Sequence, residues 1–155
     1  MIIYQVLREI LVQCIGAVVS ILALFGLKLS NSEFNGRAIN QYRRTILLQN
    51  DMIIHRFYVY ETLIHHNFVV LQTGSGHTFK VHLIADVYPG EFSPITVEIG
   101  PAEWRPISES IKKCYKTVLE LQFFVMNEIQ IFGVYEVGFN DCRHFARAVA
   151  AFLVS

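Results

Sequence analysis

The strongest constraint on the fold is a β-hairpin pattern in the middle of the chain. Residues 53–60, 63–73 and 77–87 are rich in β-branched and aromatic side chains, and residues 74–76 read Gly-Ser-Gly. Short glycine-containing turns between such runs are typical of hairpins. If residues 74–76 form the loop, Thr73 faces His77 and Phe68 faces His82. The sequence therefore predicts two antiparallel strands with a defined register.

This register places two histidines on one face of the predicted sheet. His66 faces Ile84, so His66 and His82 are diagonal neighbours on the same side, because side chains alternate with a period of two. Diagonal positions are roughly 7–8 Å apart, a distance that two imidazole rings can bridge. A loop shifted by one residue would break the pairing. Each histidine could also be an ordinary polar residue on a half-exposed sheet.

The rest of the chain predicts a single α+β domain. A length of 155 residues fits one domain, and a composition of 53% hydrophobic and 17% charged residues excludes intrinsic disorder. The formal charge of zero argues against nucleic-acid binding through a basic surface. We predict a short helix over 37–48, a strand over 95–99, a long helix over 108–130 and a last helix over 142–154. The predicted fold class is α+β, a small antiparallel sheet with helices packed on it.

The N-terminal segment is unusually apolar. Residues 10–27 carry no charged side chain, and a helix of this length rises roughly 27 Å against a hydrocarbon core of about 30 Å. We therefore divide the chain into an apolar N-terminal helix over 1–29, a candidate membrane anchor, and an α+β domain over 30–155. Such a protein would be membrane-associated and otherwise intracellular. The alternatives are a helix packed on the domain and, less well supported, a cleaved secretory signal.

The cysteines exclude some classes of site and leave one candidate nucleophile. Cys14, Cys114 and Cys142 are widely spaced, and the absence of a Cys-x-x-Cys motif excludes a zinc ribbon or a thioredoxin-like pair. Cys14 and Cys114 lie in apolar stretches and fit buried structural residues. Cys142 instead follows a glycine-containing loop and opens the last predicted helix.

A helix start is a favourable place for a reactive thiol. Asn140 or Asp141 is a good N-cap, which leaves Cys142 in the first turn. Backbone N–H groups and the helix dipole favour the thiolate there, and the same groups could donate to an oxyanion. His144 is turned roughly 200° around the helix from the thiol, so we do not expect it to be the base.

The order of these residues resembles a known family. His66 precedes the hairpin loop, His82 follows it, and Cys142 lies in a late Asn-Asp-Cys-Arg-His-Phe segment at a helix start. The pattern resembles the circularly permuted papain-like (NlpC-type) thiol enzymes, in particular the lecithin retinol acyltransferase-like and PPPDE-type branches. The resemblance covers about residues 50–154, and it rests on the order and spacing of several short motifs.

The resemblance implies a fold, a site and an activity. The fold would be circularly permuted papain-like, with Cys142 as nucleophile, His66 as general base and His82 as its orienting partner. Asn140 would belong to the Asn-Cys signature, although Asp141 stands between the two residues. The implied enzyme is a hydrolase or acyltransferase acting on an ester, thioester or amide, with a membrane lipid or acyl compound as a candidate substrate. No cofactor or metal is expected.

Two other classes of function remain open at this stage. The first is a catalytically idle papain-like binding module tethered to a membrane, which the anionic Asp141 beside the thiol favours. The second is a zinc site formed by His66, His82 and Cys142, whose side chains are good zinc ligands.

Overall fold

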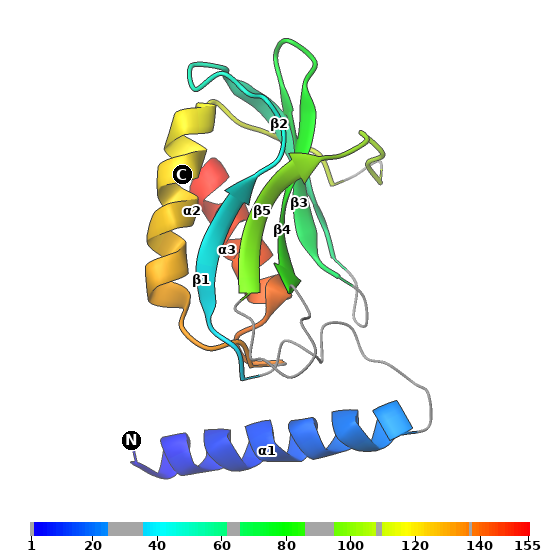
Figure 1. The fold of residues 1–155 in the computed structure, drawn as a ribbon, viewed down its shortest axis with the longest axis vertical. Coiled ribbons are helices and arrows are strands. Elements are labelled where there is room, and N and C mark those ends of the chain that lie inside the picture. The colour runs from blue at the N-terminus through cyan, green and yellow to red at the C-terminus, as the bar shows by residue number, and fades with distance from the viewer. Residues whose placement is uncertain (1, 25–35, 62–65, 86–94, 108–109, 137) are drawn as a thin grey trace.

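The computed structural model describes residues 2–24, 36–61, 66–85, 95–107, 110–136 and 138–155, with the side chains of the first segment described up to residue 15. These residues form three helices and a six-stranded sheet, a mixed α+β architecture (Figure 1). In chain order the elements are α1 (Ile2–Leu24), β1 (Ile39–Arg44), β2 (Ile54–Tyr60), β3 (Phe68–Thr73), β4 (Thr78–Ala85), β5 (Ile95–Pro101), β6 (Lys112–Lys113), α2 (Val118–Phe132) and α3 (Cys142–Leu153).

The sheet contains the predicted hairpin in the predicted register. The strand order is β1-β5-β4-β3-β2-β6, with β1 parallel to β5 and the other neighbours antiparallel. Val69 pairs with Val81, and the Thr73 N–H donates to the His77 carbonyl at 2.9 Å. Because residues 74–76 form the loop, as predicted, the side-chain parity of both strands is also confirmed.

Helices α2 and α3 cover one face of this sheet. The helix α3 packs on β2, β3 and β4, and α2 packs on β1 and on α3, so that both helices lie on the same side of the strands (Figure 1). In β4 the odd-numbered Phe79, Val81 and Leu83 are almost fully buried and belong to the core cluster. The even-numbered residues of β4 therefore project from the opposite face, which we call the open face.

The helix predicted over residues 37–48 is wrong, because this segment contains strand β1. Ile39 is 3% exposed and pairs with Ile95, and the strand runs parallel to β5 at the edge of the sheet. The unpaired edge of β5 offers backbone hydrogen bonds that a surface helix here would leave unused. Tertiary pairing therefore decides the structure of a segment whose apolar spacing is ambiguous.

The long helix predicted over residues 108–130 begins too early. The helix α2 begins at Val118, and the preceding residues form β6 and an extended segment in which Cys114 is buried. A capping box marks the true start: the Thr117 side chain accepts from the Glu120 N–H at 3.1 Å, and the Glu120 carboxylate accepts from the Thr117 N–H at 3.2 Å. This Thr-x-x-Glu signal is present in the sequence.

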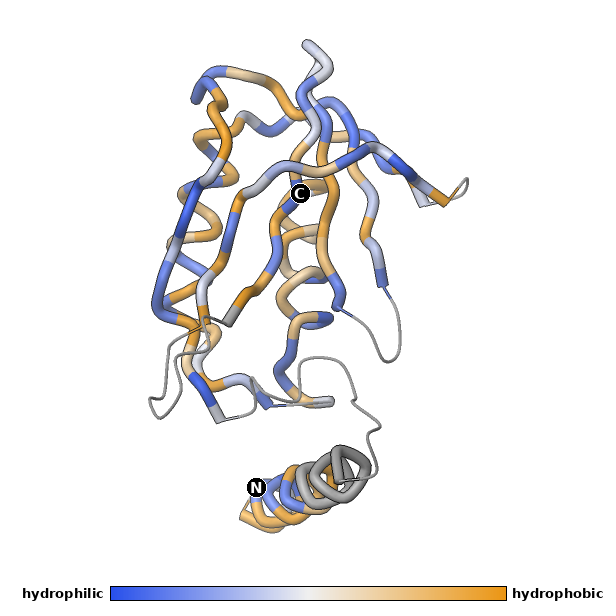
Figure 2. Tube along the Cα trace, turned by 45° about the vertical axis from the view of Figure 1, so that its right-hand side comes forward, coloured by the Kyte–Doolittle hydropathy of each residue, from blue (hydrophilic) through white to orange (hydrophobic). Residues whose placement is uncertain are grey.

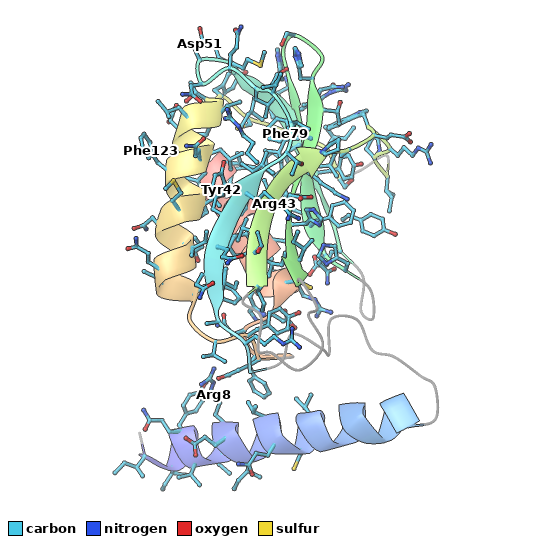
Figure 3. All side chains as sticks on the ribbon, in the orientation of Figure 1. Arg8, Tyr42, Arg43, Asp51, Phe79 and Phe123 are labelled. Atoms are coloured by element: carbon cyan, nitrogen blue, oxygen red, sulfur yellow. The ribbon has the colours of Figure 1, made fainter. Side chains whose placement is uncertain are left out.

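The helix α1 lies beside the ends of the strands and carries many hydrophobic residues (Figure 2). Arg8, labelled in Figure 3, forms an ion pair with Glu136 at 2.6 Å. A Cβ atom added to Gly138 would lie 3.5 Å from the Ile15 side chain, so Ile15 of α1 lies near the loop before α3. Residues 25–27 of the predicted membrane span lie outside the described residues. Within the described part of the chain, no helix is both long enough and apolar enough to cross a membrane.

Candidate functional site

Cys142 is the first residue of α3, as the sequence predicts. The N-cap is Asp141, whose carboxylate accepts from the N–H groups of Arg143 at 3.1 Å and His144 at 3.4 Å. The same carboxylate accepts from the Gly138 N–H at 2.9 Å and lies 2.9 Å from His144 Nδ1. Burial alone would raise the pKa of Asp141, but these hydrogen bonds outweigh it and lower the pKa. The charge beside the thiol is thus used to cap the helix.

Among the described residues, the side chains of Asn67 and Tyr135 are hydrogen-bonded to Cys142. Asn67 Nδ2 donates to Sγ at 3.4 Å. The Tyr135 hydroxyl accepts from the Cys142 N–H at 3.1 Å. Burial, followed by the negative charge of an ionised Cys142, raises the pKa of Tyr135, so its hydroxyl keeps its proton. The cysteine is 4% exposed.

Asn140 shapes the loop that leads into α3. Its side-chain amide donates to the carbonyl oxygens of Phe132 at 2.6 Å and Val134 at 3.0 Å. Its backbone N–H donates to the Glu136 carbonyl at 2.8 Å. The amide hydrogens of Asn140 are therefore used to hold the end of α2 against the start of α3. The geometry gives Asn140 a positioning role for the turn that carries Cys142.

A row of four polar residues lies on the open face of the sheet. His66 Nε2 is 3.1 Å from His82 Nδ1, which confirms the predicted juxtaposition of the two histidines. His82 Nε2 is 2.8 Å from Glu98 Oε1, and the second oxygen of Glu98 lies 2.9 Å from Arg43 Nη2. Strands β4, β5 and β1 bring the members together, because Glu98 pairs with both His82 and Arg43. Figure 3 shows Arg43 on the side of the sheet opposite α3.

The hydrogen bonds of this row assign the protons on both rings. Burial would raise the pKa of Glu98, but its bonds to His82 and Arg43 lower it, so the carboxylate is ionised and can only accept. His82 therefore carries a proton on Nε2. Burial lowers the pKa of His82 despite the opposing effect of Glu98, so the ring is neutral and its Nδ1 accepts from His66 Nε2. His66 therefore carries its proton on Nε2, and the lone pair on its Nδ1 is not used by a hydrogen bond within the row.

His66 stays neutral well below physiological pH. Burial, followed by the charges of His82 and Lys80, lowers its pKa to about 4. Such a ring is an acceptor of protons and hydrogen bonds rather than a cation at neutral pH.

Gly100 makes room for the Glu98 carboxylate. A Cβ atom at this position would lie 2.7 Å from Glu98 Oε1 and 3.2 Å from Thr45 Oγ1. Any larger residue therefore pushes aside the oxygen that bonds to His82. This requirement comes from close approach and not from backbone conformation.

The predicted triad is divided between the two faces of the sheet. His66 is joined to His82 on the open face, whereas Cys142 belongs to the helix-covered face, where Asn67 rather than His66 contacts its sulfur. Consecutive residues point to opposite sides of an extended chain, which is why residues 66 and 67 meet different partners. The structure thus brings together His66 with His82, and it does not bring His66 into hydrogen-bond contact with Cys142.

Sequence reasoning missed four members of these groups. Glu98 and Arg43 depend on the pairing of β5 with β4 and β1, which no local pattern fixes. Tyr135 lies in an irregular segment without a signal of its own. Asn67 could have been found, because the confirmed period of two places it on the face opposite His66.

The zinc alternative is not favoured by this arrangement. Within the described residues, no group of three or more His, Cys, Asp or Glu side chains is arranged to hold a metal ion.

Comparisons with known proteins add no relative from which a role could be transferred. No family model, no curated protein and no solved structure matches the chain.

Proposed function

We propose that the chain is a cysteine-dependent hydrolase or acyltransferase with Cys142 as nucleophile, acting on an ester, thioester or amide. The observation that carries the proposal is the setting of the Cys142 sulfur, in the first turn of α3 with the Asn67 amide donating to it and the Tyr135 hydroxyl bound to the Cys142 N–H. Hydrogen-bond donors aimed at a sulfur favour the thiolate, which is the reactive form. The order of His66, His82 and Cys142 supports a relation to the circularly permuted papain-like thiol enzymes.

Acyl transfer would proceed in two steps. The Cys142 sulfur attacks the carbonyl carbon, the leaving alcohol, thiol or amine departs with a proton, and a thioester remains on the enzyme. Water or an acceptor alcohol or amine then attacks the thioester and releases Cys142. The apolar side chains exposed on α1, such as Ile2, Ile3 and Leu7, support an acyl or lipid substrate over a peptide.

The oxyanion donor in this proposal is a side chain. The first N–H groups of α3 are engaged, because Cys142 donates to Tyr135 and Arg143 and His144 donate to Asp141. The backbone donors expected from the sequence are therefore occupied. Asn67 already points an amide hydrogen at the sulfur, and a carbonyl oxygen bound beside the sulfur would meet the same amide.

The proposal also needs a group that accepts the proton of the Cys142 thiol. His66, with His82 behind it, is the predicted base, and its ring must leave His82 to reach the sulfur. Residue 66 precedes the first paired residue of β3, Phe68, so this rotation breaks no strand pairing. His65 lies outside the described residues and has the opposite parity to His66 in the sequence. Both histidines therefore belong in the test.

The test is acylation of the intact protein by an activated ester. Incubation with p-nitrophenyl butyrate should add one butyryl group, detected by intact-mass spectrometry and mapped by peptide sequencing to Cys142. Cys142→Ala should abolish the adduct, while Cys114→Ala, a change at the other buried cysteine, should retain it. His66→Ala and His65→Ala identify the base by which of them slows acylation, by roughly a hundredfold or more. Acylation that survives in Cys142→Ala overturns the proposal.

A non-catalytic binding module is the second candidate. The observation that favours it is the separation described above: His66 is engaged by His82, and Cys142 is 4% exposed. In that case the folded wild-type protein forms no butyryl adduct.

A further inference from the structure

The open face of the sheet carries a cleft that the thiol chemistry does not use. Its volume is about 530 Å³. The segment 101–105 forms one side of it. The described side chains that form its floor and rim come from β2, β3, β4 and that segment, and include Tyr58, Tyr60, Phe68, Val70, Lys80 and Arg105.

The floor of the cleft is aromatic and apolar. Tyr60 pairs with Phe68 across β2 and β3, and their rings stack with centroids 5.0 Å apart. Val70 lies opposite Lys80 on β4 and is 1% exposed. A flat apolar group of about the size of a phenyl ring would find stacking partners on this floor.

The wall of the cleft is fixed to the sheet. The Arg105 N–H donates to the Tyr58 hydroxyl at 3.1 Å, and the Tyr58 ring meets the Trp104 ring edge-on at 5.0 Å. The guanidinium of Arg56 lies 4.3 Å from the centre of the Trp104 ring. The wall is therefore held by three separate contacts, and a ligand would not have to order it on binding.

The charge in the cleft is positive. Lys80 is half-buried, and its Nζ lies 5.4 Å from the centre of the Phe68 ring. Arg105 forms an exposed ion pair with Glu103 at the rim. Among the described residues, Lys80 has no carboxylate partner. Its charge lowers the pKa values of His66 and His82, and burial, the larger cause, keeps both rings neutral. The ammonium group thus stands over an aromatic floor without a counter-charge.

We propose that this cleft binds a small organic anion, with its carboxylate at Lys80 and its apolar or aromatic body stacked on Tyr60 and Phe68. The proposal goes beyond the thiol chemistry, because the cleft and Cys142 belong to opposite faces of the sheet.

A bound anion would also change the pKa of His66 in the histidine row. Neutralising Lys80 removes one of the charges that hold the pKa of His66 down, so a bound anion raises that pKa.

The protein carries its own reporter for this site. Trp104 is the only tryptophan of the chain, and it contacts Tyr58 at the wall of the cleft. Titration of the full chain with 3-phenylpropanoate should give a saturable change in tryptophan fluorescence. The neutral 3-phenylpropanol and the cationic 3-phenylpropylamine share the same body and should bind at least roughly tenfold more weakly, the effect of losing a charged hydrogen bond.

Matched lysine variants test the assigned charge. Lys80→Met keeps the aliphatic stem and should weaken 3-phenylpropanoate by roughly tenfold, while Lys113→Met on the exposed strand β6 should not change it. The His66 resonances, followed by NMR, should titrate at higher pH when the anion is bound. Equal affinity for the acid, the alcohol and the amine would overturn the proposal, as would equal behaviour of the two lysine variants. Cys142→Ala should bind the anion normally, so failure of the thiol chemistry and failure of this site are distinguishable.

Discussion

On one face of β4, Phe79, Val81 and Leu83 pack beneath α2 and α3, whereas on the other face Lys80 and His82 belong to a polar row and an anion-sized cleft. The same strand therefore supplies part of the core with one face and part of a polar surface with the other. The alternation of an extended chain separates them without any extra element. The comparison teaches that neighbouring residues of β4 can be changed with very different consequences, because one packs in the core and the next lies on the polar open face.

The largest expected effect is on the free energy of unfolding, and it tests whether the two faces of β4 differ in their contribution to stability. Phe79→Ala removes a fully buried ring and should lower the free energy of unfolding by about 3–5 kcal/mol, whereas Lys80→Ala next to it should change it by about 0.5 kcal/mol or less. Urea denaturation measures both. Comparable losses in the two variants would mean that the open face also holds the fold together.

The second effect is a pH dependence that arises from the open face. The pKa of His66 is about 4 in the folded protein and 6.5 in the unfolded chain. Between these values the unfolded chain binds a proton that the folded protein does not, so the free energy of unfolding falls as the pH drops from about 6.5 to about 4. The contribution of His66 to the free energy of unfolding is constant above and below this window. The loss is at most about 3 kcal/mol.

Urea denaturation across this pH range should show the effect, and two variants isolate it. His66→Gln should flatten the dependence, although His82 contributes in the same direction. His77→Gln, on the exposed end of the hairpin, should retain the wild-type dependence. A wild-type protein as stable at pH 4.5 as at pH 7 would contradict the burial of a neutral His66.

The smallest effect sharpens the description of the polar row. Gly100→Ala should displace the Glu98 carboxylate from His82, because the new methyl group would lie 2.7 Å from Oε1. Glu98 raises the pKa of His82, so the variant should lower it, as should Glu98→Gln. The free energy of unfolding should change by about 1 kcal/mol or less, because the carboxylate is at the end of a flexible side chain. An NMR titration of His82 that is unchanged in Gly100→Ala would contradict this assignment.

The parts of the fold that the sequence predicts are those encoded locally. The register of β3 and β4 follows from one glycine-containing loop, and the start of α3 follows from an N-cap residue before an apolar helical stripe. Strand β1 could not be predicted in the same way, because its partner β5 is more than fifty residues away in the sequence. The start of α2 could be predicted from the Thr117 and Glu120 capping box, which is a local signal.

The candidate site also contains some contacts that follow from local sequence and others that depend on the tertiary structure. The contact of His66 with His82 is a property of one hairpin, and period-two alternation was sufficient to predict it. The neighbours of Cys142 come from the start of β3 and from an irregular segment before α3, so Asn67 and Tyr135 required the tertiary structure. The relation of His66 to Cys142 stays a prediction that depends on a side-chain rotation.

Both edges of the sheet end in adjacent basic residues. One edge strand, β6, consists of Lys112 and Lys113, both exposed, and the opposite edge strand, β1, ends with Arg43 and Arg44. An edge strand offers unpaired backbone groups to any other extended chain. Two copies of this protein that approach through β6 would bring four lysines together before any backbone hydrogen bond forms. The repulsion between these lysines opposes pairing of two copies through the β6 edge.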